Sequence, residues 1–159
     1  LHEGVVKRLN QGVWIEQILE EVRLPEDLAK ELYLAPVYGC PTFVVHGIHR
    51  RYAGWYDGNP SHLFPSKTKD IAKEVVTLAG GPEALLNRCK ILKEDGEIQM
   101  ALHLVDFVLD NPETANLNEA HQLKADLLQA KADAEPSLIA RNIFTTGARR
   151  ERQATSEGK

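Results

Sequence analysis

Apolar residues recur at steps of three and four along most of the chain, which is the spacing of one face of an α-helix. The clearest stripe lies in the second half and consists of Ile98, Ala101, Leu102, Val105, Val108 and Leu109. Alternation of apolar and polar residues, the pattern of a half-buried strand, is almost absent. The chain is therefore predicted to be all-α, an array of successive helices.

Proline and glycine residues divide the first half of the chain into separate predicted elements. A helical stretch from Leu1 is expected to end at Pro25, and residues 24–39 are expected to form an ordered loop with one helical turn. A new helix is predicted from Pro41 to the turn at residues 57–60. One side of this helix is expected to carry Phe43, Gly47, Ile48, Arg51, Tyr52 and Trp55.

The second half contains equally clear breaks. Ser66 is predicted to cap a helix, and a short last helix is predicted from Pro136 to about Phe144. The apolar side of the helix after Ser66 is expected to consist of Ile71, Val75 and Leu78. Residues 148–159 are polar and lack apolar periodicity, so they are expected to form a disordered tail or an element that packs on an absent partner.

These breaks suggest an N-terminal helical arm at residues 1–64, a helical hairpin core at residues 65–147 and the polar tail. In the core, two helices meet at Gly96, with Ala101 five positions later and Pro112 soon after the second helix. This spacing is similar to a tetratricopeptide repeat, although the Trp and Tyr expected in its first helix are missing. A generic antiparallel helix pair explains the same residues equally well. In both interpretations their side chains form the core.

The composition limits the classes of partner. The chain has 159 residues, of which 43% are apolar, enough for one ordinary core or two small ones. Its formal net charge of −4 provides no basic excess for binding phosphates, so nucleic acid is not an expected partner. No apolar run approaches the roughly 20 residues of a membrane-spanning helix. Because the sequence starts at Leu1 inside a predicted helix, we expect it to be a piece of a longer protein.

Few residues have the spacing of a catalytic or metal site. His46 and His49 lie three positions apart and could share one side of a helix, but a zinc site needs three or four ligands. Cys40 and Cys89 are far apart and form no CxxC pair, so both are expected to be buried thiols. The sequence contains no phosphate-binding loop or nucleophile elbow. We therefore predict neither a catalytic residue nor a metal ligand in this sequence.

One stretch of the sequence is far more specific than the rest. It begins with Tyr38-Gly39 and continues, after a gap, with Arg51-Tyr52-Ala53-Gly54-Trp55-Tyr56-Asp57-Gly58-Asn59-Pro60. This stretch resembles the signature of the alkyl sulfatase dimerisation domain. The surrounding segments RLNQG, LPEDLAK and LAGGPEALL occur in the family's order, so the resemblance extends from about Leu1 to Phe144.

The resemblance implies a specific place in a larger enzyme. In this family the domain builds a homodimer and follows a metallo-β-lactamase-like domain, which binds two zinc ions and hydrolyses alkyl sulfate esters. The zinc ligands belong to an HxHxDH motif and to later residues of that preceding domain, and this sequence contains no such motif. The fragment is therefore expected to bind no cofactor and to have no activity alone, while its parent is expected to be a binuclear zinc hydrolase.

The sequence departs from the family at positions that face the substrate. Typical members carry Ser-His-Asn-Val-Arg just after the Tyr-Gly pair, and their His is understood to approach the sulfate group. The aligned residues here are Thr42-Phe43-Val44-Val45-His46. Phe43 cannot donate a hydrogen bond to a sulfate, whereas His46 can. Both are expected to lie near the substrate, and the departure leaves the identity of that substrate open.

Aromatic residues are concentrated in the signature. Tyr52, Trp55 and Tyr56 lie within five residues of one another, and clusters of this kind anchor protein cores and interfaces. One interpretation is a dimer contact, and the other is an ordinary internal core. For the whole chain we expect a dimerisation scaffold. The alternative is a free-standing tetratricopeptide-like adaptor that binds other proteins.

Overall fold

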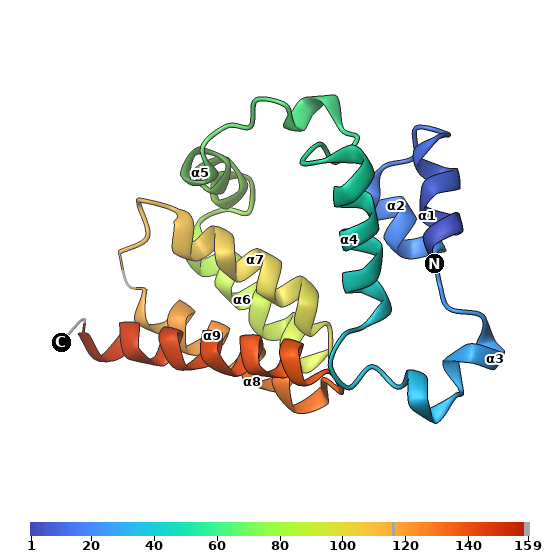
Figure 1. Cartoon of the computed structure of the whole chain (residues 1–159). Coiled ribbons are helices and arrows are strands. Elements are labelled where there is room, and N and C mark those ends of the chain that lie inside the picture. Colours follow the sequence, from blue (N-terminus) through green and yellow to red (C-terminus); the bar gives the residue numbers. More distant parts are fainter. Residues whose placement is uncertain (116, 158–159) are drawn as a thin grey trace. The chain divides into compact units, whose positions relative to one another are not determined.

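The polypeptide folds into helices and connecting loops (Figure 1). The computed structural model describes residues 1–115 and 117–157, and these ranges contain nine α-helices and no strand. The predicted all-α class is confirmed. The chain forms two compact units, which are Leu1–Pro65 with Pro136–Ile139, and Ser66–Glu135 with the chain from Ala140 onward. No helix in the described ranges has both the length and the apolar character needed to cross a membrane.

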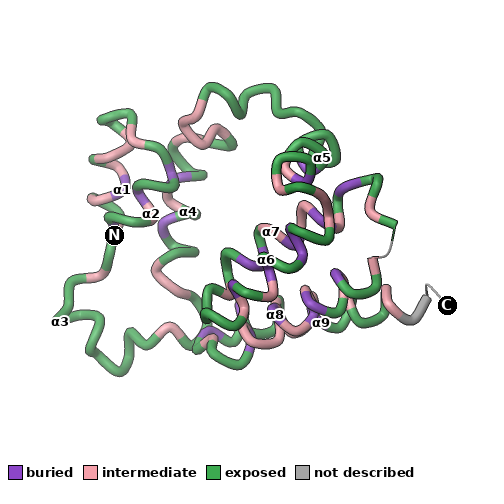
Figure 2. The backbone as a smooth tube through the Cα atoms, turned by 180° about the vertical axis from the view of Figure 1, so that it is seen from behind, coloured by how far each residue is buried: buried purple, intermediate pink, exposed green. Residues whose placement is uncertain are grey.

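The first unit is a small helical cluster. Its helices are α1 (His2–Leu9), α2 (Ile15–Glu21), α3 (Glu26–Ala29), α4 (Pro41–Ala53) and the 3₁₀ turns Leu32–Leu34 and Pro60–His62. Helices α1 and α2 both pack against α4. Their shared core consists of Val5, Ile15, Ile18, Val22 and Val45. Around α3 the backbone is almost wholly exposed (Figure 2), as expected for the predicted ordered loop.

Helix α4 buries a different side from the one predicted. Its buried residues are Val45 and His49, whereas Phe43, Tyr52 and Trp55 are exposed. The prediction is confirmed only at Ile48, which is partly buried and packs against the core beside Val45. It followed the largest apolar side chains, whereas α1 and α2 cover the side that carries Val45 and Ile48. The aromatic side chains are therefore available to other partners.

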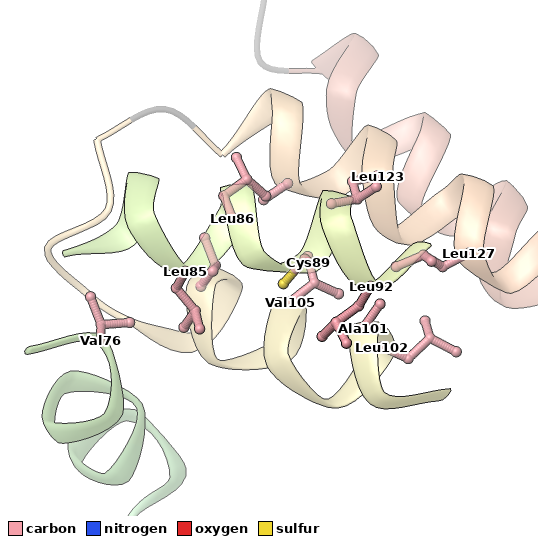
Figure 3. Packing of buried hydrophobic residues seen from close by; sticks show 12 residues of the cluster. Val76, Leu85, Leu86, Cys89, Leu92, Ala101, Leu102, Val105, Leu123 and Leu127 are labelled. Carbon is pink, nitrogen blue, oxygen red and sulfur yellow. The ribbon is translucent and has the colours of Figure 1, made fainter. Parts of the chain in front are cut away.

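The second unit is a layered helical array. Its helices are α5 (Thr68–Leu78), α6 (Pro82–Glu94), α7 (Ile98–Asp110), α8 (Asn118–Ala134) and α9 (Leu138–Glu157), the last of which starts in the first unit. Helix α7 is central, because α5, α6 and α8 all pack against it. The buried side chains that these helices share interlock around Cys89 and Val105 (Figure 3). The predicted α7 stripe is confirmed at Ala101, Leu102, Val105 and Val108.

Helices α6 and α7 form a hairpin around Gly96. The φ of Gly96 is 81°, a left-handed conformation that lets the chain reverse after α6. The amide of Glu97 donates to the carbonyl of Leu92 at 2.8 Å, which satisfies one of the free carbonyls at the end of α6. Burial raises the pKa of Cys89 on α6 to about 11, so its thiol stays protonated. Cys40, the other thiol, is only partly buried.

Helix α5 corrects a second prediction. Ser66 does not cap it, because the helix begins at Thr68 and Lys67 is the preceding residue. Its buried residues are Ala72 and Val76. Of the predicted side, Val75 is partly buried and packs against the core, while Ile71 is 42% and Leu78 is 86% exposed. Helix α5 packs against α7, and Val76 belongs to the core around α7. The buried side is therefore displaced by one residue from the predicted one.

Helix α9 is longer than predicted. The helix expected to end near Phe144 continues to Glu157, so residues 148–157 of the predicted tail are helical. Residues 158 and 159 lie outside the described residues. The extension packs closely on α8, since a Cβ added at Gly147 would lie 3.2 Å from Leu128 Cδ1.

Polar contacts hold the extension of α9. Glu151 Oε2 lies 2.6 Å from His121 Nδ1, and Glu151 Oε1 lies 3.0 Å from Lys124 Nζ. Lys124 also lies 3.0 Å from Asp106 Oδ1 on α7. Burial opposes the charge of Lys124, but these two carboxylates raise its pKa above the ordinary value. Among residues 148–155, whose burial is described, only Ala148 is buried, so apolar periodicity gives no sign of this packing.

The buried core predicts a large difference between two leucines of the second unit. Leu127→Ala is expected to lower the free energy of unfolding by about 2–5 kcal/mol, because it leaves a cavity beside α7. Leu78→Ala, the matched control, removes the same atoms from an exposed position and is expected to change it by less than about 0.5 kcal/mol. Urea unfolding followed by circular dichroism measures both. Equal losses would contradict the assigned core.

Candidate functional site

The signature segment begins where α4 ends. Gly54 has a φ of 70°, which a residue with a side chain rarely adopts, and its amide donates to the carbonyl of Arg50 at 3.1 Å. The helix therefore stops at Ala53 and the chain turns into Trp55 and Tyr56. This turn gives the aromatic residues a fixed exit direction from α4.

The side chains of the segment hold the following turn in place. Asp57 Oδ1 accepts a hydrogen bond from the amide of Asn59 at 2.8 Å, and Asn59 Oδ1 accepts one from the amide of Ser61 at 3.1 Å. Asp57 Oδ2 lies 2.5 Å from His62 Nδ1. Such side-chain to backbone bonds are typical of Asx turns. Residues 57–62 are therefore joined to one another by hydrogen bonds within the turn.

The same turn is fastened to the start of α2. The amide of Ile15 donates to the carbonyl of Asp57 at 3.1 Å. Gly58 has a φ of 106°, and a Cβ added there would lie 2.7 Å from Trp14 Cδ1. Only glycine satisfies both the conformation and the close approach. The DGN motif therefore fixes how the end of α4 meets α2.

Asp57 is ionised under ordinary conditions. The hydrogen bond to His62, and then the backbone hydrogen bond from Asn59, hold the pKa of Asp57 below its ordinary value. Both carboxylate oxygens are engaged by these two donors. Both oxygens of this carboxylate therefore have a hydrogen-bond partner inside the turn.

The aromatic residues of the signature are mostly at the surface. Trp55 is 77% exposed and Tyr52 is 54% exposed, while Tyr56 is half-buried and meets the indole of Trp55 edge to face at 6.2 Å. The interpretation of an internal core is therefore wrong for Tyr52 and Trp55. The hydroxyl of Tyr52 lies 3.0 Å from His2 Nε2, which fixes its ring against α1.

The Tyr38-Gly39 pair is anchored by residues far away in sequence. Ser137 Oγ donates to the carbonyl of Tyr38 at 2.7 Å, and the amide of Leu138 donates to the carbonyl of Val37 at 2.6 Å. The side chain of Tyr38 itself is 68% exposed. No local signal in the sequence identifies Ser137 as the partner, because the contact joins residues 99 positions apart.

An open depression of about 410 Å³ lies beside the end of α4. Its lining consists of Ile15, His46, His49, Arg50, Gly54, Trp55 and Asp57. His46 is thus one of the lining residues, whereas Phe43, the other predicted substrate-facing residue, is not among them. Sequence reasoning noticed His49 only as a neighbour of His46 and did not notice Arg50. The i, i+3 and i+4 spacing on one helix was the available signal.

The residues of this site do not fit a zinc ion. Within residues 1–115 and 117–157, no group of three or more His, Cys, Asp or Glu side chains is arranged to hold a metal. His46 and His49 provide two imidazoles, but the nearby carboxylate of Asp57 is already bound to His62 and Asn59. A binuclear zinc centre would need ligands from outside this chain.

Comparison with known proteins identifies relatives along almost the whole chain. The family model described as "Alkyl sulfatase dimerisation" matches residues 14–154. The chain is 31% identical over 154 residues to an alkyl/aryl-sulfatase of Saccharomyces cerevisiae, covering 96% of this chain and 23% of that protein. It is 30% identical over 150 residues to an (R)-specific secondary-alkylsulfatase of a Pseudomonas species, covering 93% of this chain and 22% of that protein.

Solved structures show the same likeness. A stereoselective inverting sec-alkylsulfatase from a Pseudomonas species matches with a TM-score of 0.83 and 30% identity, over 93% of this chain and 23% of the other. A double mutant of a sec-alkyl sulfatase matches with a TM-score of 0.86 and 28% identity, over 95% of this chain and 24% of the other. The chain therefore spans about a quarter of the length of these proteins.

The close approach at Gly58 predicts a strong effect of adding one methyl group. Gly58→Ala is expected to destabilise the first unit by at least about 2 kcal/mol, through backbone strain and overlap with Trp14. Gly47→Ala is the matched control, because Gly47 lies inside α4 with open space where a Cβ would project. This substitution is expected to stabilise the helix by about 0.5–1 kcal/mol. Thermal unfolding of both variants tests the assignment, which fails if Gly58→Ala is tolerated.

The lowered pKa of Asp57 predicts a loss of stability in acid. A depressed carboxylate contributes stability that is fully present above the unfolded pKa, about 3.9, and is lost as pH falls through the lower folded value. Asp57→Asn removes this contribution. The thermal midpoint of the wild type is expected to exceed that of the variant at neutral pH, and the two are expected to converge as pH falls below the unfolded pKa and through the lower folded one. A difference that does not depend on pH would contradict the role of the charge.

Proposed function

Because the chain belongs to the alkyl sulfatase dimerisation family, matched over residues 14–154, we propose that it is the dimerisation scaffold of a zinc-dependent alkyl-sulfatase-like hydrolase. The parent enzyme is proposed to hydrolyse sulfate esters, as the names of the relatives indicate for those proteins. The catalytic part corresponds to the portion of the relatives that this chain does not match. Within the whole protein, the chain is proposed to join two subunits.

The exposed aromatic residues carry this proposal. Tyr38, Tyr52 and Trp55 present large apolar surfaces on elements whose backbones are fixed by hydrogen bonds. Exposed aromatic side chains on a rigid support are typical of the anchors of protein interfaces, because little conformational entropy is lost when they become covered. We propose that residues 1–64 use these anchors against a second subunit and against the preceding metallo-β-lactamase-like domain.

The proposal assigns no chemical step to the chain itself. The described residues do not fit a zinc centre, and the HxHxDH motif is absent from the sequence. Zinc ions held by the preceding domain would lower the pKa of a bound water and polarise the ester. The contribution of this chain is to position its own side chains next to that domain.

Phe43 and His46 are proposed to face the substrate. Both lie on the exposed part of α4, and His46 offers a ring nitrogen to an anionic group. Phe43 offers only apolar contact. We infer that this part of the substrate site is less polar than in family members with the Ser-His-Asn run, so that the parent prefers a different ester.

A free-standing tetratricopeptide-like adaptor is the alternative function. The α6–α7 hairpin, with its turn at Gly96 and buried Ala101, supports this alternative. The coding sequence upstream of Leu1 distinguishes the two proposed functions. An HxHxDH motif upstream in the same reading frame supports the hydrolase, whereas a start codon near Leu1 supports the adaptor.

The proposal predicts how zinc and activity divide between the chain and the longer protein. The chain alone is expected to retain less than about 0.1 equivalent of zinc after dialysis against a weak chelator and to leave alkyl sulfates intact, since its donor set is incomplete. The chain extended upstream is expected to bind about two equivalents of zinc and to release sulfate. Elemental analysis and sulfate release measure the two quantities. One equivalent of zinc retained by the chain alone would contradict the proposal.

Trp55 is predicted to act in association and not in folding. Because the indole is 77% exposed, Trp55→Ala is expected to leave the thermal midpoint of the monomer within about 2 °C of the wild type. Loss of an aromatic anchor of about 2 kcal/mol is expected to raise the dimer dissociation constant at least about tenfold. Phe64→Ala, also highly exposed but outside the signature, is the control. Sedimentation equilibrium measures the association. If the wild-type chain is entirely monomeric at high micromolar concentration, the proposed dimer is refuted.

A further inference from the structure

The two halves of α9 are held in place by different kinds of contact. In the first half, Ala140 is buried and Phe144 is partly buried. In the extension, only Ala148 is buried among residues 148–155, whose burial is described. The ion pairs of Glu151 are therefore the main contacts available to hold the extension against α8.

Four charged or titratable side chains from three helices meet at this position. Glu151 Oε2 lies 2.6 Å from His121 Nδ1, and Glu151 Oε1 lies 3.0 Å from Lys124 Nζ, both on α8. Lys124 Nζ also lies 3.0 Å from Asp106 Oδ1 on α7. The side chains of Glu151, His121 and Lys124 are only 16%, 22% and 24% exposed. Water therefore screens these pairs less than it screens ion pairs at the open surface.

The charges of this cluster balance only when His121 carries a proton. Burial lowers the pKa of Lys124, but its contacts with Asp106 and Glu151 raise the pKa more, so the ammonium group stays charged. Two carboxylates thus face one ammonium group. Asp106 Oδ1 is buried and has no hydrogen-bond partner in the described ranges, although Lys124 lies close to it. With a neutral imidazole at His121, one negative charge in the cluster remains uncompensated.

Among the side-chain types of the cluster, only histidine ordinarily gains or loses a proton between about pH 5 and pH 8. A proton on His121 places a positive charge beside the Glu151 carboxylate and turns their hydrogen bond into an ion pair. Stabilisation that depends on a bound proton is present at low pH and is lost as pH rises. The attachment of the extension is thus expected to weaken from acid towards alkaline pH.

A weak point in the helix separates its two halves. Thr145, Thr146 and Gly147 follow one another, and glycine and β-branched residues are among the weaker helix formers. Ala140 and Phe144 both precede this point, so loss of the second half would leave their apolar contacts intact. The helix can therefore open after Phe144 while the rest of the second unit stays folded.

We propose that Asp106, His121, Lys124 and Glu151 form a pH-sensitive latch, in which protonated His121 holds residues 148–157 against α8 and loss of its proton releases them. The released part includes Arg149, Arg150 and Arg152, whose side chains are exposed in the docked helix. The latch depends only on contacts within the second unit. It requires neither zinc, dimerisation nor hydrolysis, so the experiments on the proposed function test it separately.

Trypsin measures the release, because it cleaves after the three arginines of the extension only when the helix opens. A free peptide with the sequence of residues 146–157 corrects for the effect of pH on the protease itself. The corrected rate of cleavage in the extension is expected to rise about fivefold from about pH 6 to about pH 8. Cleavage after Arg88 on α6 is expected to stay constant, because the core remains folded. A corrected rate that does not change with pH would overturn the latch.

Two histidines of the second unit provide matched variants. His121→Gln keeps a donor for Glu151 but cannot titrate, so its extension is expected to be cleaved at the alkaline wild-type rate at both pH values. His103→Gln is the control, because His103 is exposed on α7 and has Gln99 as its hydrogen-bond partner. This control is expected to keep the pH dependence of the wild type. The latch is refuted if His121→Gln retains that pH dependence or if His103→Gln abolishes it.

Glu151→Gln tests the other side of the ion pair. This variant removes the negative charge that faces both His121 and Lys124, so its extension is expected to be cleaved at least about fivefold faster than that of the wild type at pH 6. An unchanged rate of cleavage after Arg88 shows that the variant is folded. A wild-type rate of cleavage in the extension at pH 6 would show that Glu151 does not hold it.

Discussion

The backbone of Gly58 lies against the indole of Trp14, closer than a residue with a side chain would permit. This contact sets the position of the whole signature turn, because it lets the carbonyl of Asp57 accept the hydrogen bond from the amide of Ile15 at the start of α2. Once the turn is placed, the end of α4 has one possible direction. Trp55 then remains outside while His49 is covered. A glycine conformation and one backbone hydrogen bond therefore decide which side chains of α4 are free.

The second unit depends on a different constraint, which is the central place of α7. Three helices pack on it, so its apolar stripe must serve three contacts at once. From α5, Val76 is buried in this core and Val75 is packed against it. The extension of α9 contacts α8 through the close approach of Gly147 to Leu128 and through the carboxylate of Glu151. Apolar packing therefore defines the middle of the unit, and polar contacts define its outer layer.

Sequence reasoning succeeded where the chain carries local information. Glycine and proline marked the ends of most helices, and the α7 stripe was strong enough to identify its buried side. It failed where burial depends on a neighbour that the sequence does not specify. The apolar sides of α4 and α5 were assigned by residue size, whereas the structure buries His49 and Ala72 and exposes Leu78. The bond from Ser137 to Tyr38 joins distant residues, and no local pattern predicts such a contact.

Helix α4 carries one of the proposed dimer anchors and also contributes residues to the depression beside its end. Its exposed side carries Tyr52 and leads into Trp55, the proposed anchors of a dimer, while the next residues around the helix are His46 and Arg50 beside the depression. Trp55 belongs to both sets, because it is exposed and also lines the depression.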